Sequence, residues 1–439
     1  MSANRRIAVI GGGASGALAS LHCWRQAGDS VDIVVIDPSP HLGHGRAYST
    51  KDTEYLLNVP VGNMSAFPDD PSDFERWVIQ FDPEIRNSRY WPYLPRKYFG
   101  AYLESHLNKI PERRLLHVRS RVASVSTRYG SYCLTLENQS TIEADDLIVA
   151  TGYRHSMPSS PALNSSKHVI QASALEVMGP EEISGRVLIV GSGLTAIDVW
   201  KRLRKCQKVK DFTFISRRGL VPLTHDAHIA SHAELPSFQN KTPLQILKLA
   251  RDLKERLPVS WPEIAHKIRS EANDIWQNWH GHHKAQFLQH LKPYWEILRH
   301  RMPGAISEEL SFDIQSQRAK ILSGRILQIQ SDSYGAVIEI RHRKSHQFER
   351  LRADWIVMAT GSVIDQTLFN ESYVQGIECC PYGFGYLNND APNLWLIGPA
   401  SKSRLWEITA IPDIRIQAVQ IAQQLTLLRD YKIAHHENI

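Results

Sequence analysis

Two glycine-rich turns, each between an apolar strand pattern and a helix pattern, constrain the fold of this chain more than any other feature. The first reads GGGASG from Gly11 to Gly16 and follows the apolar run Ile7–Ile10. A helical stretch leads from it to Gly28, and a second apolar run, Val31–Asp37, closes with a carboxylate. Strand, glycine turn, helix and strand with a terminal acid form the βαβ unit that binds dinucleotides.

Each residue of this first pattern has a physical role. Gly11 makes the tight turn, Gly13 lets the backbone approach a pyrophosphate, and Gly16 allows the helix to pack closely. Asp37 can accept hydrogen bonds from the hydroxyls of a ribose. The complete βαβ unit disfavours the simpler interpretation, a structural strand-to-helix turn.

The same design recurs from Gly185 to Leu203, where a strand leads into a small-residue turn and a helix. The residues of this turn are Gly191, Gly193 and Ala196. The next strand ends in Ser216, Arg217 and Arg218 instead of an acid.

An arginine beside a serine suits a 2′-phosphate, whereas an acid suits a free 2′-hydroxyl. The two strand ends therefore predict FAD in the first turn and NADPH in the second. A solvated pair of loop arginines is the alternative interpretation of the second strand end.

Two similar stretches, ADDLIVATGY (144–153) and ADWIVMATGS (353–362), lie on either side of the second turn. They predict that the NADPH module is inserted in the FAD module. We expect an α/β fold with two Rossmann-like domains and a helical insert. The expected FAD domain covers 1–168 and 355–439, the NADPH domain covers 169–354, and the insert covers about 241–303. The insert would either cover a pocket or only support the NADPH domain.

Charge and composition limit the partners. The sequence has 51 Lys and Arg and 45 Asp and Glu, which gives a net charge of +6. Because the positive residues are scattered along the sequence, no nucleic-acid partner is expected. No apolar stretch could cross a bilayer and no signal-peptide pattern fits, which predicts a cytoplasmic protein without a membrane partner. The five cysteines form no CxxC pair. HGHH, from His280 to His283, lacks acidic or cysteine partners, so we expect a polar loop and no metal.

Several longer motifs resemble the bacterial FAD-NAD(P)-binding family of flavoprotein oxidoreductases. They are LGHGRAYST (42–50), YLLNVPVGNMSAFPDDPSDFERW (55–77), SRRGLVPLTHD (216–226), YWEILRHRMP (294–303) and LWEITAIPDIRIQA (405–418). An FAD-dependent urate hydroxylase is among the family's members, and the architecture is similar to that of flavin N-hydroxylating monooxygenases. The Gly-Asp that usually ends the late FAD motif is replaced here by Gly398-Pro399.

The resemblance and the turns together predict the cofactor site. We expect Ile411, Pro412 and Trp406 at a helix start near the flavin ring. The full expected cofactor-binding set is Gly11, Gly13, Ser15, Gly16, Asp37, Arg46, Asn58, Val59, Met64, Ser65, Thr151, Gly152, Gly191, Gly193, Thr195, Ala196, Ser216, Arg217, Arg218, Thr360, Gly361, Gly398, Ile411 and Pro412.

The predicted chemistry follows from the absence of a CxxC pair, because hydride from NADPH must then pass through FAD to oxygen, a quinone or a substrate. The preferred interpretation is a monooxygenase that hydroxylates a small polar molecule, anionic or nitrogen-containing, through a C4a-hydroperoxyflavin. The expected catalytic residues are Asn58, Arg299, Arg301 and Trp406, with His225 and Asp226 as further candidates on the substrate or nicotinamide side. A solvated, ion-paired helix end is the alternative for the two arginines. An NAD(P)H-flavin dehydrogenase or electron-transfer flavoprotein and a non-catalytic NAD(P)H-sensing flavoprotein remain open, as does a homo-oligomer.

Overall fold

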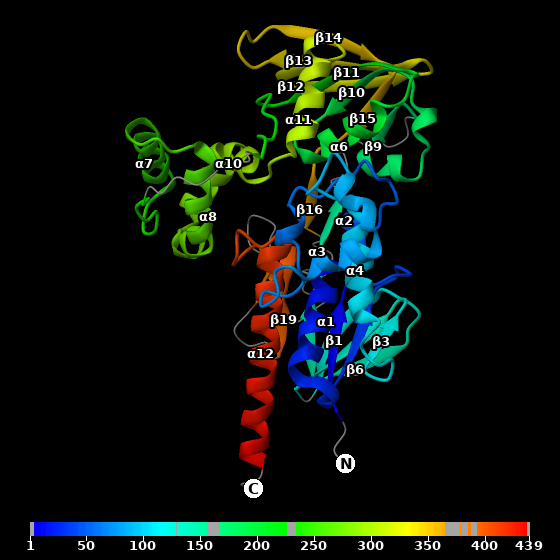
Figure 1. The fold of residues 1–439 in the computed structure, drawn as a ribbon, viewed down its shortest axis with the longest axis vertical. Helices are drawn as coiled ribbons and strands as arrows, with labels where there is room; N and C mark the ends of the chain where they lie inside the picture. The colour runs from blue at the N-terminus through cyan, green and yellow to red at the C-terminus, as the bar shows by residue number, and fades with distance from the viewer. Residues whose placement is uncertain are drawn as a thin grey trace. The chain divides into compact units, whose positions relative to one another are not determined.

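The computed structural model describes residues 4–128, 130–155, 167–225, 234–364, 377–379, 385–387 and 393–436. The chain divides into two compact units. The first unit consists of Met1–Lys51, Val59–Arg154 and Ile364–Ile439, and the second of Asp52–Asn58 and His155–Val363. Figure 1 traces both units from blue at the N-terminus to red at the C-terminus.

A five-stranded sheet in the order β19-β7-β1-β2-β3 forms the centre of the first unit. All its neighbouring strands are parallel. Its central strands are apolar runs that are buried almost throughout, as expected for a sheet covered on both faces. The strand bounds are β1 Arg5–Ile10, β2 Val31–Ile36, β3 Leu115–Val118, β7 Asp146–Val149 and β19 Leu394–Leu396.

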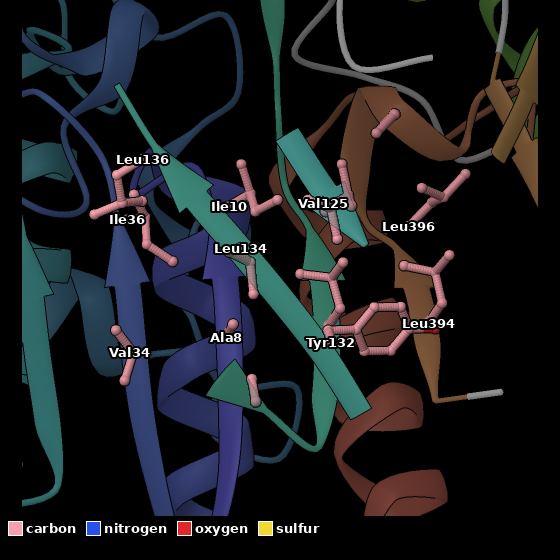
Figure 2. Close-up of a cluster of buried hydrophobic side chains, with 14 residues drawn as sticks. Ala8, Ile10, Val34, Ile36, Val125, Tyr132, Leu134, Leu136, Leu394 and Leu396 are labelled. Atoms are coloured by element: carbon pink, nitrogen blue, oxygen red, sulfur yellow. The ribbon is translucent and has the colours of Figure 1, made fainter. Parts of the chain in front are cut away.

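An antiparallel sheet in the order β4-β5-β6 closes one side of the first unit's core. Figure 2 shows Tyr132 and Leu134 of β5 facing Ile10 of β1 and Leu394 of β19 within one buried cluster. The period-two burial of β5 explains this packing, because alternate side chains reach the core. The bounds are β4 Val122–Arg128, β5 Ser131–Leu136 and β6 Thr141–Ala144.

Helices α1 and α12 of the first unit pack against each other, and α1 also packs on β1, β2 and β7. The helix bounds in this unit are α1 Ala14–Ala27, α2 Gly45–Tyr48, α3 Asp73–Phe81, α4 Lys97–Leu107 and α12 Ile411–His436. Two further strand pairs are short: β17 Ile377–Cys379 pairs with β18 Gly385–Leu387 in the first unit, and β8 Tyr153–His155 pairs with β16 Ser362–Ile364 at the residues where the chain changes unit.

A seven-stranded sheet in the order β14-β13-β12-β11-β10-β15-β9 forms the second unit. Its strands β12, β11, β10, β15 and β9 run parallel, and β13 and β14 continue it as antiparallel strands. Helix α6, Leu194–Leu203, follows β10. The strand bounds are β9 Val169–Gln171, β10 Gly185–Val190, β11 Val209–Ser216, β12 Ala319–Asp332, β13 Gly335–His342, β14 Phe348–Ala353 and β15 Trp355–Met358.

Helices occupy the stretch in which the sequence predicts a helical insert. They are α7 Pro243–Arg256, α8 Trp261–Asn278, α9 Gly281–Gln286, a π-helical turn Phe287–Leu291 and α10 Lys292–Arg299, with α11 Gly304–Gln315 after them. Thr242 caps α7 in a capping box with Gln245. The HGHH stretch is not the expected loop, because α9 begins at Gly281, directly after His280.

The predicted fold class is confirmed, but the structure draws the unit boundaries elsewhere than the sequence does. The sequence predicts that the FAD domain resumes at residue 355, whereas Trp355–Met358 is hydrogen-bonded to β10 inside the second unit's sheet. The first unit resumes at Ile364. Among the described residues, no helix is both long enough and apolar enough to span a bilayer.

Candidate functional site

The turn after β1 packs backbone directly on backbone. Gly11 has φ +99°, and a Cβ atom there would lie 2.8 Å from the carbonyl oxygen of Ala150. A Cβ atom on Gly16 would lie 1.9 Å from the carbonyl oxygen of Gly11. Glycine avoids both collisions, and it adopts the left-handed conformation of Gly11 without strain.

The N-terminus of α1 is available to bind a ligand, because no side chain among the described residues occupies it as a cap. Gly13 is its N-cap, and no side chain caps this helix end. The first N–H groups of a helix have no intrahelical acceptor and attract anions such as a pyrophosphate. A Cβ atom on Gly13 would lie 3.4 Å from Cα of Gly45. Arg46, an exposed cation, directly follows Gly45 in the chain, so its backbone lies close to this turn.

Asp37, the residue after β2, binds the same turn. Its Oδ2 accepts a hydrogen bond from the Gly12 N–H at 2.7 Å, and its Oδ1 accepts one from the Ser39 N–H at 2.8 Å. A carboxylate oxygen has two acceptor sites, so both oxygens can still accept a ribose hydroxyl. Asp37 therefore braces the glycine turn as well, which sequence reasoning missed.

A third segment, the turn after β19, presses against the start of α1. Gly398 has φ +65°, and a Cβ atom there would lie 2.3 Å from Ser15 Oγ. The Gly398 N–H donates to Gln417 Oε1 at 2.9 Å, while Gln417 Nε2 donates to the carbonyl oxygen of Leu396 at 3.0 Å. Gln417 was not predicted, although it lies in the quoted IPDIRIQA motif.

Thr151 completes the first cradle. It follows Ala150, and its Oγ1 is buried without a hydrogen-bond partner among the described residues. Leaving such a group unsatisfied costs about 1–3 kcal/mol, so a bound ligand with a hydrogen-bonding group would stabilise it. Gly152, next in the chain, is exposed and has nothing within 4 Å of the position of a Cβ atom. The open glycine turn, the uncapped helix, the acid and this hydroxyl all fit FAD.

The segment from Asn58 to Ser65 shows one clear departure from the prediction. The carbonyl oxygen of Asn58 lies 2.9 Å from His225 Nε2. Val59 is half-buried, and Met64 is buried. The Ser65 side chain is fully buried, and its hydroxyl lies 2.6 Å from the carbonyl oxygen of Asp70 as donor. This hydroxyl is committed to its own turn, which argues against a direct bond from it to a cofactor.

The second cradle repeats the contact that the first glycine makes in the first cradle. Gly191 has φ +127°, and a Cβ atom there would lie 2.3 Å from the carbonyl oxygen of Ala359. In both units, then, the first glycine of the turn meets the alanine carbonyl of an Ala-Thr-Gly segment. Gly193 is the N-cap of α6, has no side-chain cap, and has nothing within 4 Å of its Cβ position. The two Ala-Thr-Gly stretches of the sequence indicate this contact, but it was not predicted from them.

The other expected residues of the second cradle lie around this turn. Thr195 is exposed in the first turn of α6, while Ala196 is fully buried where a larger side chain would displace the helix. Thr360 and Gly361 follow Ala359, and Gly361 has φ +86°.

The three residues at the strand end of the second cradle have two different roles. Ser216 Oγ accepts from the Gly219 N–H at 2.9 Å and lies 2.8 Å from Ser192 Oγ, so it stabilises the turn. Arg217 is exposed. Arg218 lies against the helical insert, with its guanidinium 5.4 Å from the centre of the Tyr294 ring.

The structure brings two of the motifs that resemble the family together in the second unit. The Met302 N–H donates to the carbonyl oxygen of Leu223 at 2.8 Å, and the His225 N–H donates to the carbonyl oxygen of Met302 at 2.9 Å. The turn that carries Arg301 is therefore fixed beside His225, whose ring meets Asn58. Asp226 lies outside the described residues.

Arg299 and Arg301 belong to a basic region of the insert. Arg299 ends α10, and both side chains are half-buried. Burial, Arg269, Arg299 and Arg301 together lower the pKa of His266 on α8. The nearby cationic groups therefore disfavour a positive charge on the His266 ring.

The expected helix start near the flavin is at Ile411, where α12 begins with Pro412 in its first turn. Trp406 lies before this helix and is buried, with Lys402 Nζ 4.4 Å from the centre of its ring. The prediction that Trp406 itself stands at the helix start is wrong, because the chain makes turns and bends up to residue 410.

Comparisons with known proteins agree with this geometry. Residues 8–154 match the family model described as FAD-NAD(P)-binding, and residues 88–249 match the model of L-lysine 6-monooxygenase and L-ornithine 5-monooxygenase. The comparison with curated proteins finds no match.

Among solved structures, ornithine N-hydroxylase from Kutzneria sp. 744, with reduced FAD, NADP+ and L-ornithine, matches with a TM-score of 0.68 at 12% identity. The match covers 97% of this chain and 100% of that chain. L-lysine 6-monooxygenase from Pseudomonas syringae has a TM-score of 0.68 at 14% identity, over 96% and 98% of the two chains. The bacillithiol disulfide reductase of Staphylococcus aureus has a TM-score of 0.59 at 13% identity, over 97% and 98%.

The fold and the two cradles define the class: the chain is an FAD- and NAD(P)-binding oxidoreductase with two dinucleotide-binding units. The FAD-NAD(P)-binding match confirms the resemblance that the motifs between Leu42 and Trp77 indicate. The second family match points, within this class, to the flavin-dependent monooxygenases.

Proposed function

We propose that this protein is an FAD-dependent monooxygenase that uses NADPH and O2 to hydroxylate a small polar molecule. The observation that carries the proposal is the pair of cradles. They share one turn geometry but differ in the strand end, a carboxylate at Asp37 and an exposed cation at Arg217. A carboxylate suits the ribose of FAD, and an arginine suits the 2′-phosphate of NADPH.

Cysteine chemistry argues against the thiol-reductase alternative, which the same fold also supports. A disulfide reductase needs a reactive thiolate, and the sequence has no CxxC pair. Cys23 is buried, and burial raises the pKa of its thiol to about 12. Cys206 is also buried. A buried thiol of raised pKa such as that of Cys23 is a poor nucleophile, which favours oxygen over this thiol as the electron acceptor.

The protein's own residues would bind and orient the reactants. The α1 N-terminus and Asp37 would hold FAD, and the α6 N-terminus and Arg217 would hold NADPH. Bound FAD would supply the oxygen chemistry as a C4a-hydroperoxyflavin, while the protein supplies orientation and a water-poor site.

The substrate class follows from the helical insert and from the similar enzymes. Ornithine and lysine hydroxylases act on amino acids, which carry both an amine and a carboxylate. Arg299 and Arg301 lie in the basic region of the insert, and arginine binds planar anions with paired donors. We therefore propose a nitrogen-containing substrate with an anionic group. Amino acids are one such class, and the urate of the resembling family is another.

A screen of NADPH oxidation in air tests this function. Purified protein is mixed with NADPH and one of a panel of amino acids, diamines or purines, and NADPH loss, hydrogen peroxide and hydroxylated product are measured together. The proposal predicts slow NADPH oxidation when no compound is added and strong stimulation by one compound. The amount of hydroxylated product should then equal the amount of NADPH consumed. Stimulation by a quinone without any hydroxylated product would instead identify a dehydrogenase. If NADPH reduces the flavin but no compound in the panel stimulates turnover, the protein would be a sensing flavoprotein.

A further inference from the structure

One carboxylate of α4 binds two histidines of the segment that follows β2. Glu104 Oε1 lies 2.7 Å from His41 Nδ1, and Oε2 lies 3.0 Å from His44 Nε2. Burial raises the pKa of the Glu104 carboxyl, but the hydrogen bonds from the two histidines outweigh it, so the pKa lies below its usual value. An ionised carboxylate can only accept, so both ring nitrogens carry a proton and donate. Glu104 thus fastens residues 41–46 at two points.

Residues 41–46 lie directly on the glycine turn of the first cradle. The Gly43 N–H donates to the carbonyl oxygen of Gly12 at 2.8 Å. A Cβ atom on Gly45 would lie 2.9 Å from Cα of Gly13, the N-cap of α1. Both contacts are made by backbone, so the position of this segment shapes the turn whose N–H groups suit a pyrophosphate.

Helix α4 has a glycine where the segment packs on it. A Cβ atom on Gly100 would lie 2.7 Å from His44 Nδ1 and 2.9 Å from the carbonyl oxygen of Tyr48. A Cβ atom on Gly43 would lie 2.7 Å from Cβ of Leu103 on the same helix. Glycine inside a helix is less favourable than alanine. The close approach of the segment explains why α4 has a glycine at this position.

The segment ends in a cation at the glycine turn. His44 and Gly45 are half-buried and Arg46 is exposed, so this end of the segment is accessible to a ligand. A guanidinium forms charge-assisted hydrogen bonds with phosphate oxygens. Arg46 directly follows the glycine that lies on Gly13, so its backbone is fixed beside the α1 N-terminus. Glu104 is therefore connected to the cradle through His44 and the backbone of this segment.

The contacts of Glu104 are too exposed to stabilise the whole fold strongly. The exposed fraction of the side chain is 60% for His41, 21% for His44 and 31% for Glu104. Solvent-exposed ion pairs contribute little to the free energy of unfolding. Gly43, between the two histidines, has φ +86°, and glycine loses more conformational freedom on ordering than any other residue. Two rings held on either side of Gly43 restrict that freedom at the point where the segment contacts the turn.

We propose that Glu104 is a positioning residue that acts through His41 and His44. It holds residues 41–46 against the glycine turn and so places Arg46 to bind the pyrophosphate of FAD. This role rests on the proposed function. A site that is already ordered binds its cofactor tightly because little conformational freedom is lost on binding.

The test compares two carboxylates of the full-length protein that each bind a histidine. Glu104→Ala removes the acceptor of both rings of the segment. Glu349→Ala is the matched control, because Glu349 is also half-buried and its Oε2 lies 2.6 Å from His342 Nε2 in the second unit. Three quantities are measured for each variant: exchange of the Gly43 amide hydrogen in the FAD-free protein, the Kd for FAD, and the visible circular dichroism of bound flavin.

We expect faster Gly43 exchange, an about three- to thirtyfold higher Kd for FAD and an altered flavin dichroism in Glu104→Ala, and none of these in Glu349→Ala. Glu104→Gln keeps an acceptor but loses the charge, so its Kd for FAD should lie between those of wild type and Glu104→Ala.

Gly100→Ala disturbs the same segment from the other side. It leaves Glu104 in place and improves the helix propensity of α4, yet its Cβ atom must displace His44 and the backbone of Tyr48. We expect a higher Kd for FAD in this variant as well. Glu104→Gln and Gly100→Ala decide the matter if Glu104→Ala does not fold.

A double-mutant cycle tests whether Glu104 acts through Arg46. If it does, Glu104→Ala should raise the Kd for FAD less in Arg46→Ala protein than in wild type. Fold-changes that simply multiply would contradict the placement of Arg46 by Glu104.

Equal FAD affinity and dichroism in Glu104→Ala and Glu349→Ala, with wild-type protein binding FAD normally, would overturn the positioning role alone. Wild-type protein that binds no FAD would overturn the proposed function and the positioning role with it.

Discussion

The two cradles are alike where backbone meets backbone and different where a side chain meets the ligand. In both, a glycine of positive φ lies against the alanine carbonyl of an Ala-Thr-Gly turn, Gly11 on Ala150 and Gly191 on Ala359. The strand ends differ: Asp37 accepts from the first turn's own N–H group, whereas Arg217 extends to solvent beside the second. The comparison predicts that turn geometry makes each turn a dinucleotide cradle, and that the residue after the second strand selects the dinucleotide.

The largest expected effect separates the two cradles completely. Gly13 and Gly193 both have ordinary negative φ, so a side chain there introduces no backbone strain and mainly fills the ligand's space. Gly13→Val should weaken FAD binding at least about a hundredfold, or about 2.7 kcal/mol, and give colourless protein. Gly193→Val should keep the flavin and lose NADPH binding to a similar degree.

Flavin content by absorbance and NADPH affinity by titration measure both effects. Loss of flavin in Gly193→Val with retention in Gly13→Val would reverse the assignment of the two cradles.

The next effect tests Asp37 against a carboxylate of the same strand. Asp37→Ala removes the ribose acceptor and leaves the Gly12 and Ser39 N–H groups without their partner, so FAD affinity should fall about ten- to a hundredfold. Asp32→Ala is the control, because Asp32 bonds Asn4 and Arg114 away from the turn. An equal loss of FAD affinity in the two variants, measured by flavin titration, would show a general effect on β2 and no ribose contact.

The counterpart in the second cradle concerns the choice of nicotinamide. A charge-assisted bond from Arg217 to the 2′-phosphate is worth roughly 1.5–3 kcal/mol, so Arg217→Ala should lose about ten- to a hundredfold of the preference for NADPH over NADH. Rates of flavin reduction by each donor measure this.

Arg218→Ala is the informative comparison for this strand end. Arg218 contacts the Tyr294 ring and the carbonyl oxygen of Gln289 at 3.4 Å, so its loss should affect the insert more than the preference. If Arg218→Ala abolished the preference and Arg217→Ala left it intact, the division of roles between them would be wrong.

The smallest effect lies in the insert. Arg299→Ala or Arg301→Ala should leave FAD content and NADPH affinity unchanged, while hydroxylated product per NADPH falls several-fold and peroxide rises. Arg256→Ala is the control, because Arg256 pairs with Asp252 at 2.6 Å on the exposed face of α7. Normal coupling in both test variants, or a loss of thermal stability alone, would make these arginines structural.

The sequence predicts the two glycine turns well, because local backbone geometry requires their glycines and the spacing of the glycines indicates that geometry. Strands β1, β2, β10 and β11 and helices α1 and α6 follow from the same patterns. The capping box at Thr242 likewise predicts the start of α7, since capping depends on residues three apart.

Contacts between distant segments could not be predicted from local pattern. Arg415 and Gln417 belong to a motif quoted for its resemblance, yet their partners, Ser65 and Gly398, are set by tertiary packing of α12. The boundary at residue 355 was misplaced for the same reason: an apolar strand before an ATG turn looks the same in either sheet, and hydrogen bonding to β10 decides where it lies.

One anaerobic titration tests the central claim, that the chain holds FAD in one cradle and takes hydride from NADPH in the other. Purified protein is titrated with NADPH while its flavin absorbance is followed, and the flavin is then released by denaturation and identified by chromatography. We expect one FAD per chain, which about one equivalent of NADPH bleaches and which NADH bleaches far more slowly. Released FMN, no flavin, or FAD that neither nucleotide reduces would contradict it.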